Sequence, residues 1–204
     1  MTAIDYYFIS SSPFAYLGHK VFHQLAEAHN FEIRYKPINL AGVWEKSGSV
    51  PLAQRTPLRQ RYRRIEMQRI ADIRGVPINL EPKHFPVDPG LADRSVIALV
   101  QAGRDPSGFI GRAHAGVWAN EENIADPAQL TAYLEAEGHP AETILAAAQG
   151  QDATDTLARN TREASEADAI GAPVYVLNGE PFWGQDRLEY LAHALESGRP
   201  PFRP

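Results

Sequence analysis

The spacing of apolar residues changes near the start of the chain, and the change predicts a strand, a helix and a second strand. Residues 4–9 form a short, mostly apolar run, which is typical of a buried strand. From 14 to 30 apolar residues recur every three or four positions, as on one face of a helix. Residues 31–38 alternate apolar and charged side chains, which predicts a strand covered on one face. A helical crossover of this length predicts that the two strands are parallel.

The middle of the chain carries mainly helical patterns. Residues 42–57 have no clear period and predict a loop, and the proline-rich residues 77–89 predict an irregular crossing segment. Asp-Pro pairs supply a helix cap and a first-turn proline together. We therefore expect an all-helical block whose helices cover residues 58–75, 91–102, 105–118, 126–138, 139–149 and 152–169.

The end of the chain returns to strand patterns. Residues 174–177 are a β run, Asn178-Gly179 is a strong signal for a hairpin turn, and residues 180–183 form the returning strand before a final helix. The order β-α-β, helical block, β-β-α predicts an α/β thioredoxin-like fold with a large all-helical insertion. The expected thioredoxin-like domain comprises residues 1–40 and 166–204, and the inserted helical domain comprises residues 41–165.

Composition excludes several classes of function. The chain has 204 residues, a net charge of −5 and no cysteine. The negative charge does not favour nucleic acid as a partner, and the missing cysteines exclude disulfides and protein-based dithiol chemistry. No signal peptide is recognisable at the start, and no apolar run approaches the roughly 20 residues that cross a bilayer. We expect a cytoplasmic protein that binds neither nucleic acid nor membranes.

Ser12 is the first candidate for a functional side chain. It stands where a helix N-cap belongs, and Pro13 fits the first turn. A hydroxyl at the positive end of a helix, just past the end of a strand, is well placed to stabilise an anion. The alternative is that Ser12 only caps the helix.

Residues 55–74 contain seven arginines and only two acids, Glu66 and Asp72. They could form a surface that binds anions or nucleic acid, a solvated helix face, or a face on which one or two arginines bind a substrate carboxylate. Arg55 is the better candidate for the last role, because it lies in the predicted loop. His19 and His23 have a spacing that can bind zinc, but no third ligand is evident, so we expect no metal site.

Four motifs together resemble the 2-hydroxychromene-2-carboxylate isomerases, a family grouped with DsbA-like proteins and kappa-class glutathione transferases. The resemblance covers essentially the whole chain. The motifs are Ser12-Pro13-Phe14-Ala15-Tyr16-Leu17, a helix with Arg59, Tyr62, Glu66 and Arg69, Gly171-Ala172-Pro173, and Phe182-Trp183-Gly184-Gln185-Asp186-Arg187-Leu188.

The resemblance implies a glutathione cofactor. Ser12 would donate a hydrogen bond to the glutathione sulfur and favour its thiolate, as the catalytic residue. The backbone of Val174, after an expected cis-Pro173, would pair with the cysteinyl part of glutathione. Pro173 in trans and Asp186 as an ordinary first-turn acid are the alternatives. The γ-glutamyl end would be held by Gly184, Gln185 and Asp186.

The expected reaction converts 2-hydroxychromene-2-carboxylate into trans-o-hydroxybenzylidenepyruvate in aromatic catabolism, through a glutathione adduct, and the resemblance suggests a homodimer. Substrate-side positions differ from naphthalene-pathway members, which have a lysine, an asparagine-arginine pair and a tyrosine. Here these positions are Trp44, Gln54-Arg55 and Phe85. A glutathione transferase acting on another electrophile, and a non-catalytic glutathione-binding protein, are therefore the alternative functions.

Overall fold

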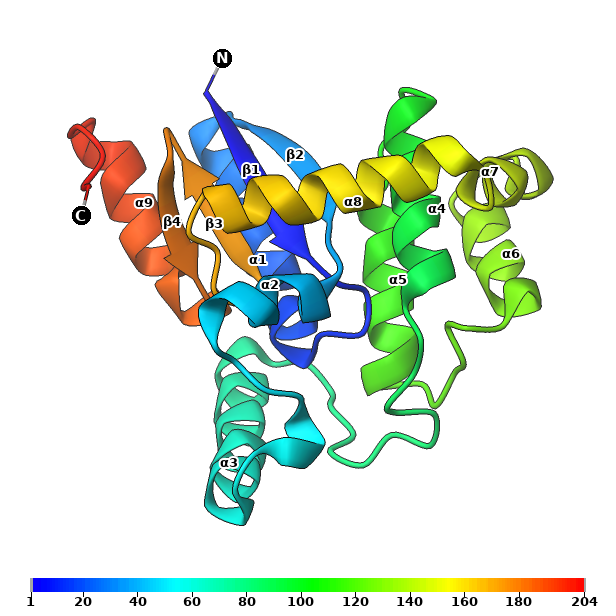
Figure 1. The fold of residues 1–204 in the computed structure, drawn as a ribbon, viewed down its shortest axis with the longest axis horizontal. Helices are drawn as coiled ribbons and strands as arrows, with labels where there is room; N and C mark the ends of the chain where they lie inside the picture. The colour runs from blue at the N-terminus through cyan, green and yellow to red at the C-terminus, as the bar shows by residue number, and fades with distance from the viewer. Residues whose placement is uncertain (1, 204) are drawn as a thin grey trace.

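A four-stranded mixed sheet forms the centre of the protein, with the strand order β2-β1-β3-β4 (Figure 1). In this computed structural model, which describes residues 2–203, β1 (Ala3–Phe8) pairs in parallel with β2 (Glu32–Pro37) and antiparallel with β3 (Val174–Leu177). β3 turns back into the antiparallel edge strand β4 (Glu180–Trp183). The four predicted strands and the parallel crossover are confirmed, and the sheet is that of the expected thioredoxin-like fold.

The first helix, α1 (Pro13–His29), joins the two parallel strands and ends at Asn30, which has a left-handed conformation. It buries Phe22 against the aromatic side chains of the sheet, where Tyr6 and Tyr175 stack with ring centroids 5.3 Å apart. A Cβ at Gly18 would lie 2.7 Å from the Cβ of Gln185, which is closer than two side chains approach. The glycine therefore lets α1 pack directly against the turn after β4.

The remaining helices surround the sheet, and Figure 1 shows α4–α7 gathered to one side, α8 crossing in front of the strands and α3 projecting from the body. The predicted helices are confirmed with small changes at their ends; the largest is that the sixth ends at Glu166 rather than at 169. Their bounds are α3 (Pro57–Arg74), α4 (Gly90–Gln101), α5 (Ser107–Trp118), α6 (Pro127–Ala136), α7 (Ala141–Ala148), α8 (Gln151–Glu166) and α9 (Leu188–Ser197).

The predicted loop over residues 42–57 is wrong in its first part. The structure has a helix, α2 (Leu40–Ser47), followed by a 3₁₀ turn, η1 (Leu52–Gln54). Asn39 caps α2, because its side chain accepts a hydrogen bond from the N–H of Ala41. Gly42 obscured the pattern, since glycine disfavours a helix interior. Here a Cβ at Gly42 would lie 3.0 Å from Thr161, so the glycine serves close packing of α2 on α8.

The larger of two cores packs side chains of α4 and α5 with those of β1 and α1. A smaller core packs Val43 of α2 and Ala164 of α8 against Tyr7 of β1. α4 and α8 also contact β2, so the helical block covers the sheet instead of standing apart from it. The boundaries of the two expected domains, 1–40 with 166–204 and 41–165, stay a prediction. Within residues 2–203, no helix is both long and apolar enough to pass through a membrane.

Candidate functional site

Ser12 caps α1, as the sequence predicts, and the hydroxyl proton of Ser12 makes only a weak hydrogen bond. The N–H of Ala15 donates to Ser12 Oγ at 3.2 Å, which satisfies one free donor of the first turn. A serine hydroxyl can accept and donate at once. Its only donation goes to the carbonyl of Ala172 at 3.5 Å, the long limit of a hydrogen bond. The proton is therefore available to a stronger acceptor.

The loop that carries Ser12 is fixed from two helices of the helical block. Ser10 donates both its N–H and its hydroxyl to Asp93 Oδ1 of α4, at 2.8 and 2.6 Å. The indole of Trp118 at the end of α5 donates to the carbonyl of Ser11 at 3.2 Å. Asp93 is fully buried, and burial raises its pKa to about 7 despite the two hydrogen bonds from Ser10. These buried contacts hold the Ser12 hydroxyl in place.

The peptide bond between Ala172 and Pro173 is cis, which confirms that prediction. Pro173 and the carbonyl of Ala172 stand beside Ser12, at the start of β3. Val174 lies inside the sheet, where it is paired with Tyr7 on one side and Trp183 on the other. Its backbone groups therefore face neighbouring strands, and the carbonyl that accepts the hydrogen bond from Ser12 belongs to Ala172.

The three residues predicted for the γ-glutamyl end form the turn that follows β4. Gly184 has φ 100°, and its N–H donates to the carbonyl of Pro173 at 2.9 Å. Gln185 is buried and Asp186 is exposed, both in the 3₁₀ turn η2 (Gln185–Arg187). Arg74, at the end of α3, donates to the Gln185 side chain at 3.0 Å. Sequence reasoning missed Arg74, because an arginine at a helix end normally only complements the helix dipole.

Two of the four predicted substrate-side residues, Trp44 and Arg55, lie close to each other. The guanidinium of Arg55 lies 5.7 Å from the ring centroid of Trp44, which is carried by α2. Arg55 Nε also donates to the carbonyl of Val50 at 3.0 Å. Gln54 is exposed at the end of η1. Phe85, on the segment between α3 and α4, packs against Trp118 in a tilted arrangement with ring centroids 4.7 Å apart.

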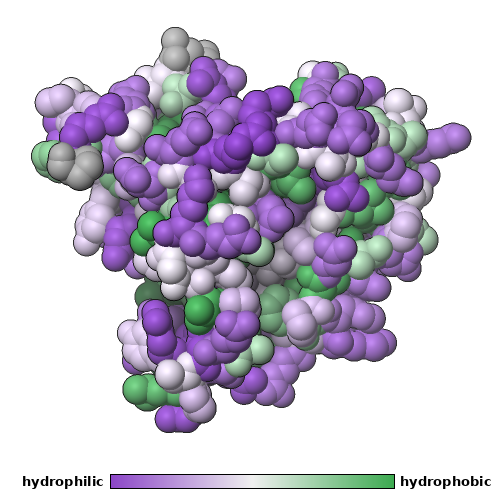
Figure 2. Space-filling view, viewed as in Figure 1, coloured by the Kyte–Doolittle hydropathy of each residue, from purple (hydrophilic) through white to green (hydrophobic). Residues whose placement is uncertain are grey.

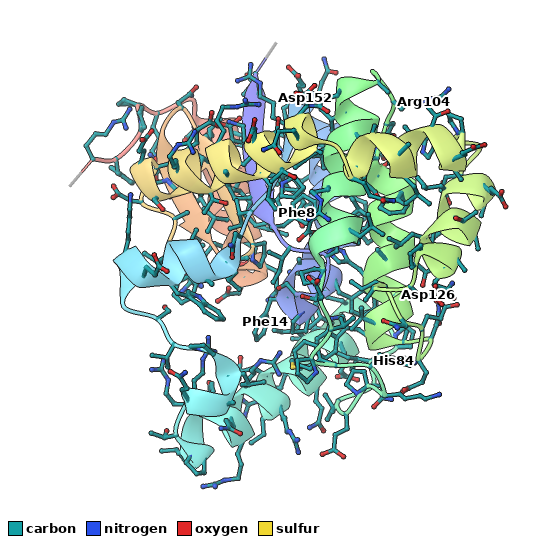
Figure 3. The ribbon with its side chains drawn as sticks, turned by 45° about the vertical axis from the view of Figure 1, so that its right-hand side comes forward. Phe8, Phe14, His84, Arg104, Asp126 and Asp152 are labelled. Atoms are coloured by element: carbon teal, nitrogen blue, oxygen red, sulfur yellow. The ribbon has the colours of Figure 1, made fainter. Side chains whose placement is uncertain are left out.

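Arg63 connects the two parts of this region, and sequence reasoning missed it among seven similar arginines. Its guanidinium lies 5.9, 5.9 and 5.7 Å from the ring centroids of Phe14, Phe85 and Trp118. Figure 3 labels Phe14 at the start of α1, above α3 in that view. Burial, with repulsion from neighbouring arginines, lowers the pKa of Arg63 to about 10. One predicted residue, Phe85, therefore shares a cation with Phe14 of α1 and Trp118 of α5.

His19 and His23 stack on α1 with ring centroids 4.2 Å apart, and His114 of α5 approaches His19 at 5.6 Å. Burial lowers the pKa of His19 to about 2 and that of His114 to about 3, so both rings are neutral near pH 7. In the part of the chain that the structure describes, no three histidines or acids are arranged to hold a metal.

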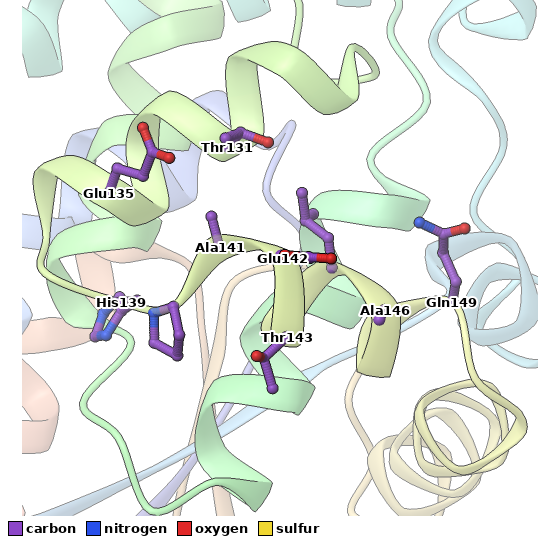
Figure 4. Close-up of a pocket in the computed structure, with 10 residues that line it drawn as sticks. Thr131, Glu135, His139, Ala141, Glu142, Thr143, Ala146 and Gln149 are labelled. Atoms are coloured by element: carbon purple, nitrogen blue, oxygen red, sulfur yellow. The ribbon is translucent and has the colours of Figure 1, made fainter.

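A surface depression of about 780 Å³ lies between α6 and α7, far along the chain from Ser12 (Figure 4). Glu135, His139 and Glu142 are among its lining residues, and none of the predicted site residues is. The candidate site is therefore defined by the Ser12 loop and its neighbours, and not by this depression.

Comparisons with known proteins agree with the fold. The model of the DsbA-like thioredoxin domain matches residues 3–196. A 2-hydroxychromene-2-carboxylate isomerase from Pseudomonas putida is 28% identical over 200 residues, which cover 94% of this chain and 93% of that protein. Glutathione S-transferase kappa 1 from Caenorhabditis elegans is 26% identical over 214 residues, which cover 97% of this chain and 92% of that protein.

A solved 2-hydroxychromene-2-carboxylate isomerase superimposes with a TM-score of 0.77 at 24% identity, covering 96% of this chain and 95% of the other. The similarity extends from β1 through the helical block to α9, so it is a likeness of whole chains. The chain belongs to the family of DsbA-like thioredoxin-domain proteins.

Proposed function

We propose that the protein is a glutathione-dependent isomerase that interconverts 2-hydroxychromene-2-carboxylate and trans-o-hydroxybenzylidenepyruvate. The observation that carries the proposal is the Ser12 hydroxyl, which caps α1 beside the Ala172–Pro173 bond in a chain without cysteine. A site with this geometry and no thiol of its own suits a sulfur brought by a cofactor. The names of the two relatives, an isomerase and a glutathione transferase, support the same reading.

The residues around Ser12 fit glutathione by their donor chemistry. The helix N-terminus and the Ser12 proton favour a thiolate over a thiol, because both stabilise negative charge. The first N–H groups of η2, at Gln185 and Asp186, have no acceptor within their own turn and suit a carboxylate. The exposed Asp186 carboxylate pairs with Arg187, and its exposed position suits an ammonium group that would compete with that ion pair. We assign the main-chain contact with the cysteinyl part to Ala172, with Val174 supporting it from within the sheet.

When bound, glutathione would supply a thiolate for reversible addition to the carbon–carbon double bond, which would let the ring open and the resulting single bond rotate before elimination restores the double bond and the thiolate. Ser12 holds the thiolate by a hydrogen bond from its hydroxyl, and the α1 N-terminus lowers the energy of the charge. Asp93 and Trp118 keep the loop from moving as the charge changes. Trp44, Gln54, Arg55 and Phe85 would form the substrate side, where the aromatic ring and carboxylate are held.

A glutathione transferase acting on another electrophile is the second candidate. The substrate side favours it, because Trp44 stands where naphthalene-pathway isomerases have a lysine and Phe85 where they have a tyrosine. A charge and a hydroxyl are thereby lost from the half of the site that faces the substrate. Turnover of the chromene carboxylate against a panel of electrophiles distinguishes the two activities by absorbance.

We also propose that the protein forms a homodimer through α3. The helix projects from the body (Figure 1), and hydrophobic residues lie among hydrophilic ones on the part of it that Figure 2 shows. Leu58, Tyr62, Ile65 and Ile73 are 67, 57, 44 and 78% exposed, which is unusual for large apolar side chains on one helix. Sedimentation equilibrium reports the mass, and a single-chain mass at micromolar concentration would count against the dimer.

Glutathione binding tests the proposed function. Calorimetry and thermal unfolding with millimolar glutathione should show binding and a higher melting temperature, because a ligand of the native state stabilises it by mass action. Ser12→Ala should still bind glutathione but lose about 10- to 100-fold in turnover of the chromene carboxylate, the worth of one hydrogen bond to a charged group.

Asp126→Ala is the matched control. Asp126 caps α6 ahead of a proline, just as Ser12 caps α1, but Figure 3 shows it well away from Phe14 at the start of α1. Both substitutions should lower stability by about 1 kcal/mol, while only Ser12→Ala should lose turnover. Absence of any glutathione binding would overturn both the isomerase and the transferase proposals.

A further inference from the structure

Arg63 differs from the other partly buried arginines near the site in having no polar partner. Arg55 donates to the carbonyl of Val50, and Arg74 donates to Gln185. Within residues 2–203, Arg63 makes neither a hydrogen bond nor an ion pair, and it is only partly buried, so its guanidinium nitrogens still reach solvent beside the ring of Phe14. Its N–H donors are therefore available to an acceptor that enters from solvent.

The surroundings of Arg63 compensate its charge only in part. Three aromatic rings face it at 5.7 to 5.9 Å, near the outer limit of about 6 Å for a cation–π contact. The neighbouring charges are cations, Arg55 and Arg64, and they add to the effect of burial in lowering the pKa of Arg63. The protein therefore maintains a local excess of positive charge inside an aromatic enclosure.

This enclosure adjoins the Ser12 loop. Phe14 follows Ser12 by two residues on α1. The ring of Trp118 faces Arg63, while its indole N–H binds the carbonyl of Ser11. A group bound by Arg63 would therefore lie against the same elements that position the Ser12 hydroxyl.

We propose that Arg63 binds the carboxylate of an aromatic acid substrate, with the ring of the acid held among Phe14, Phe85 and Trp118. This inference rests on the proposed function, which it deepens by assigning the carboxylate to Arg63 instead of Arg55. The planar guanidinium can donate two parallel hydrogen bonds to a carboxylate. The flanking aromatic rings favour a flat, apolar body on the acid over a phosphate or an aliphatic acid. Arg55 is bound to Val50 and stacked near Trp44, so it is the less available of the two.

Calorimetry with trans-cinnamate tests the assignment, with neutral cinnamamide as the matched probe of the same shape. The native protein should bind cinnamate at least tenfold more tightly than cinnamamide. Arg63→Met should lose at least tenfold in cinnamate affinity and leave the cinnamamide affinity unchanged. Arg63→Lys should retain part of the preference for cinnamate over cinnamamide, because lysine keeps the positive charge but lacks the two parallel N–H donors of a guanidinium.

Two substitutions on the same segment serve as controls. Arg61→Met removes an exposed arginine from α3 and should bind cinnamate like the native protein. Arg55→Met should lose less than threefold in cinnamate affinity. A loss larger than that of Arg63→Met would indicate that Arg55 binds the carboxylate. Unchanged cinnamate binding in Arg63→Met, or no preference for cinnamate over cinnamamide in the native protein, would overturn the inference.

Glutathione titrations of the same variants separate this inference from the proposed function. Arg63→Met should bind glutathione like the native protein, because Arg63 lies on the substrate side. If glutathione fails to bind the native protein while cinnamate binding still depends on Arg63, the proposed function fails and the carboxylate site stands. If glutathione binds the native protein but cinnamate binding does not depend on Arg63, the proposed function stands and the carboxylate site fails.

Discussion

Two charged side chains from the helical block lie in the region of the Ser12 loop, and they differ in their hydrogen bonding. Asp93 is fully buried, and one of its oxygens accepts two hydrogen bonds from Ser10. Arg63 lies against three aromatic rings and has no hydrogen-bond acceptor within residues 2–203. Both pKa values move toward the neutral form on burial, upward for the acid and downward for the base.

This difference in hydrogen bonding distinguishes a charged residue that stabilises the fold from one that can bind a ligand. A buried group whose hydrogen bonds are complete fixes the elements that it joins. A partly buried cation whose N–H donors still reach solvent can bind an anion without first breaking a contact inside the protein. We therefore interpret Asp93 as the residue that anchors the Ser12 loop and Arg63 as a residue that binds an anion.

Removal of the Asp93 acceptor should have the largest effect on stability. In Asp93→Ala, the N–H and hydroxyl of Ser10 lose their acceptor in a buried place, so the unfolding free energy should fall by about 3 kcal/mol. Asp93→Asn keeps the accepting oxygen and should lose less than about 1 kcal/mol. Urea unfolding at pH 7 measures both. An asparagine variant as unstable as the alanine variant would contradict an anchor that works through Ser10.

The pH dependence of stability sharpens the same point. The pKa of Asp93 is raised to about 7 in the folded protein, against about 3.9 when unfolded. Below pH 4 both states hold the proton, and between pH 4 and 7 the folded state holds it more tightly. The stability that protonation contributes is therefore lost as the pH rises through 7.

Asp93→Asn carries no titrating group at this position. Its stability relative to the native protein should therefore improve by about 2–3 kcal/mol between pH 5 and 8.5. Unfolding by urea at several pH values measures the difference, which cancels the titration of all other groups. A constant difference across this range would show that the Asp93 pKa is not raised.

Replacement of Arg63 should have the smallest effect on stability. Arg63→Met keeps an apolar stem among the rings and removes an unpaired charge, so the unfolding free energy should change by less than about 1 kcal/mol or increase. The same urea experiment measures it, beside the loss of carboxylate binding expected above. A decrease as large as that of Asp93→Ala would make Arg63 a structural residue and remove the contrast between the two charges.

The strands and most helices could be predicted from sequence, because each follows from a local pattern. Strand residues around Tyr175 are apolar on both faces, and Asp126-Pro127 marks the start of a helix through its own side chains. α2 could not be predicted in this way. Its central Gly42 weakens the helical pattern, and the reason for that glycine is Thr161, which is more than a hundred residues away in sequence.

The same limit applies to the candidate site. Ser12 as a cap and Pro173 in cis follow from local motifs and resemblance, and the structure confirms both features. Their roles in catalysis stay predictions. Arg63 could not be singled out among the arginines of α3, because only the position of α1 and Phe85 distinguishes it. Asp93 gave only a weak signal of a buried role, because it is an acid on an otherwise apolar helix face. An acid in the first turn of a helix is commonly explained by the helix dipole alone.

Trp118 contacts the Ser11 carbonyl with its indole nitrogen and Arg63 with its ring. One side chain therefore belongs to both halves of the site, and evolution cannot remodel one half at this position without disturbing the other. Relatives that change substrate should vary at Phe85 or Trp44 before they vary here. Divergence in this group would then proceed around a fixed tryptophan.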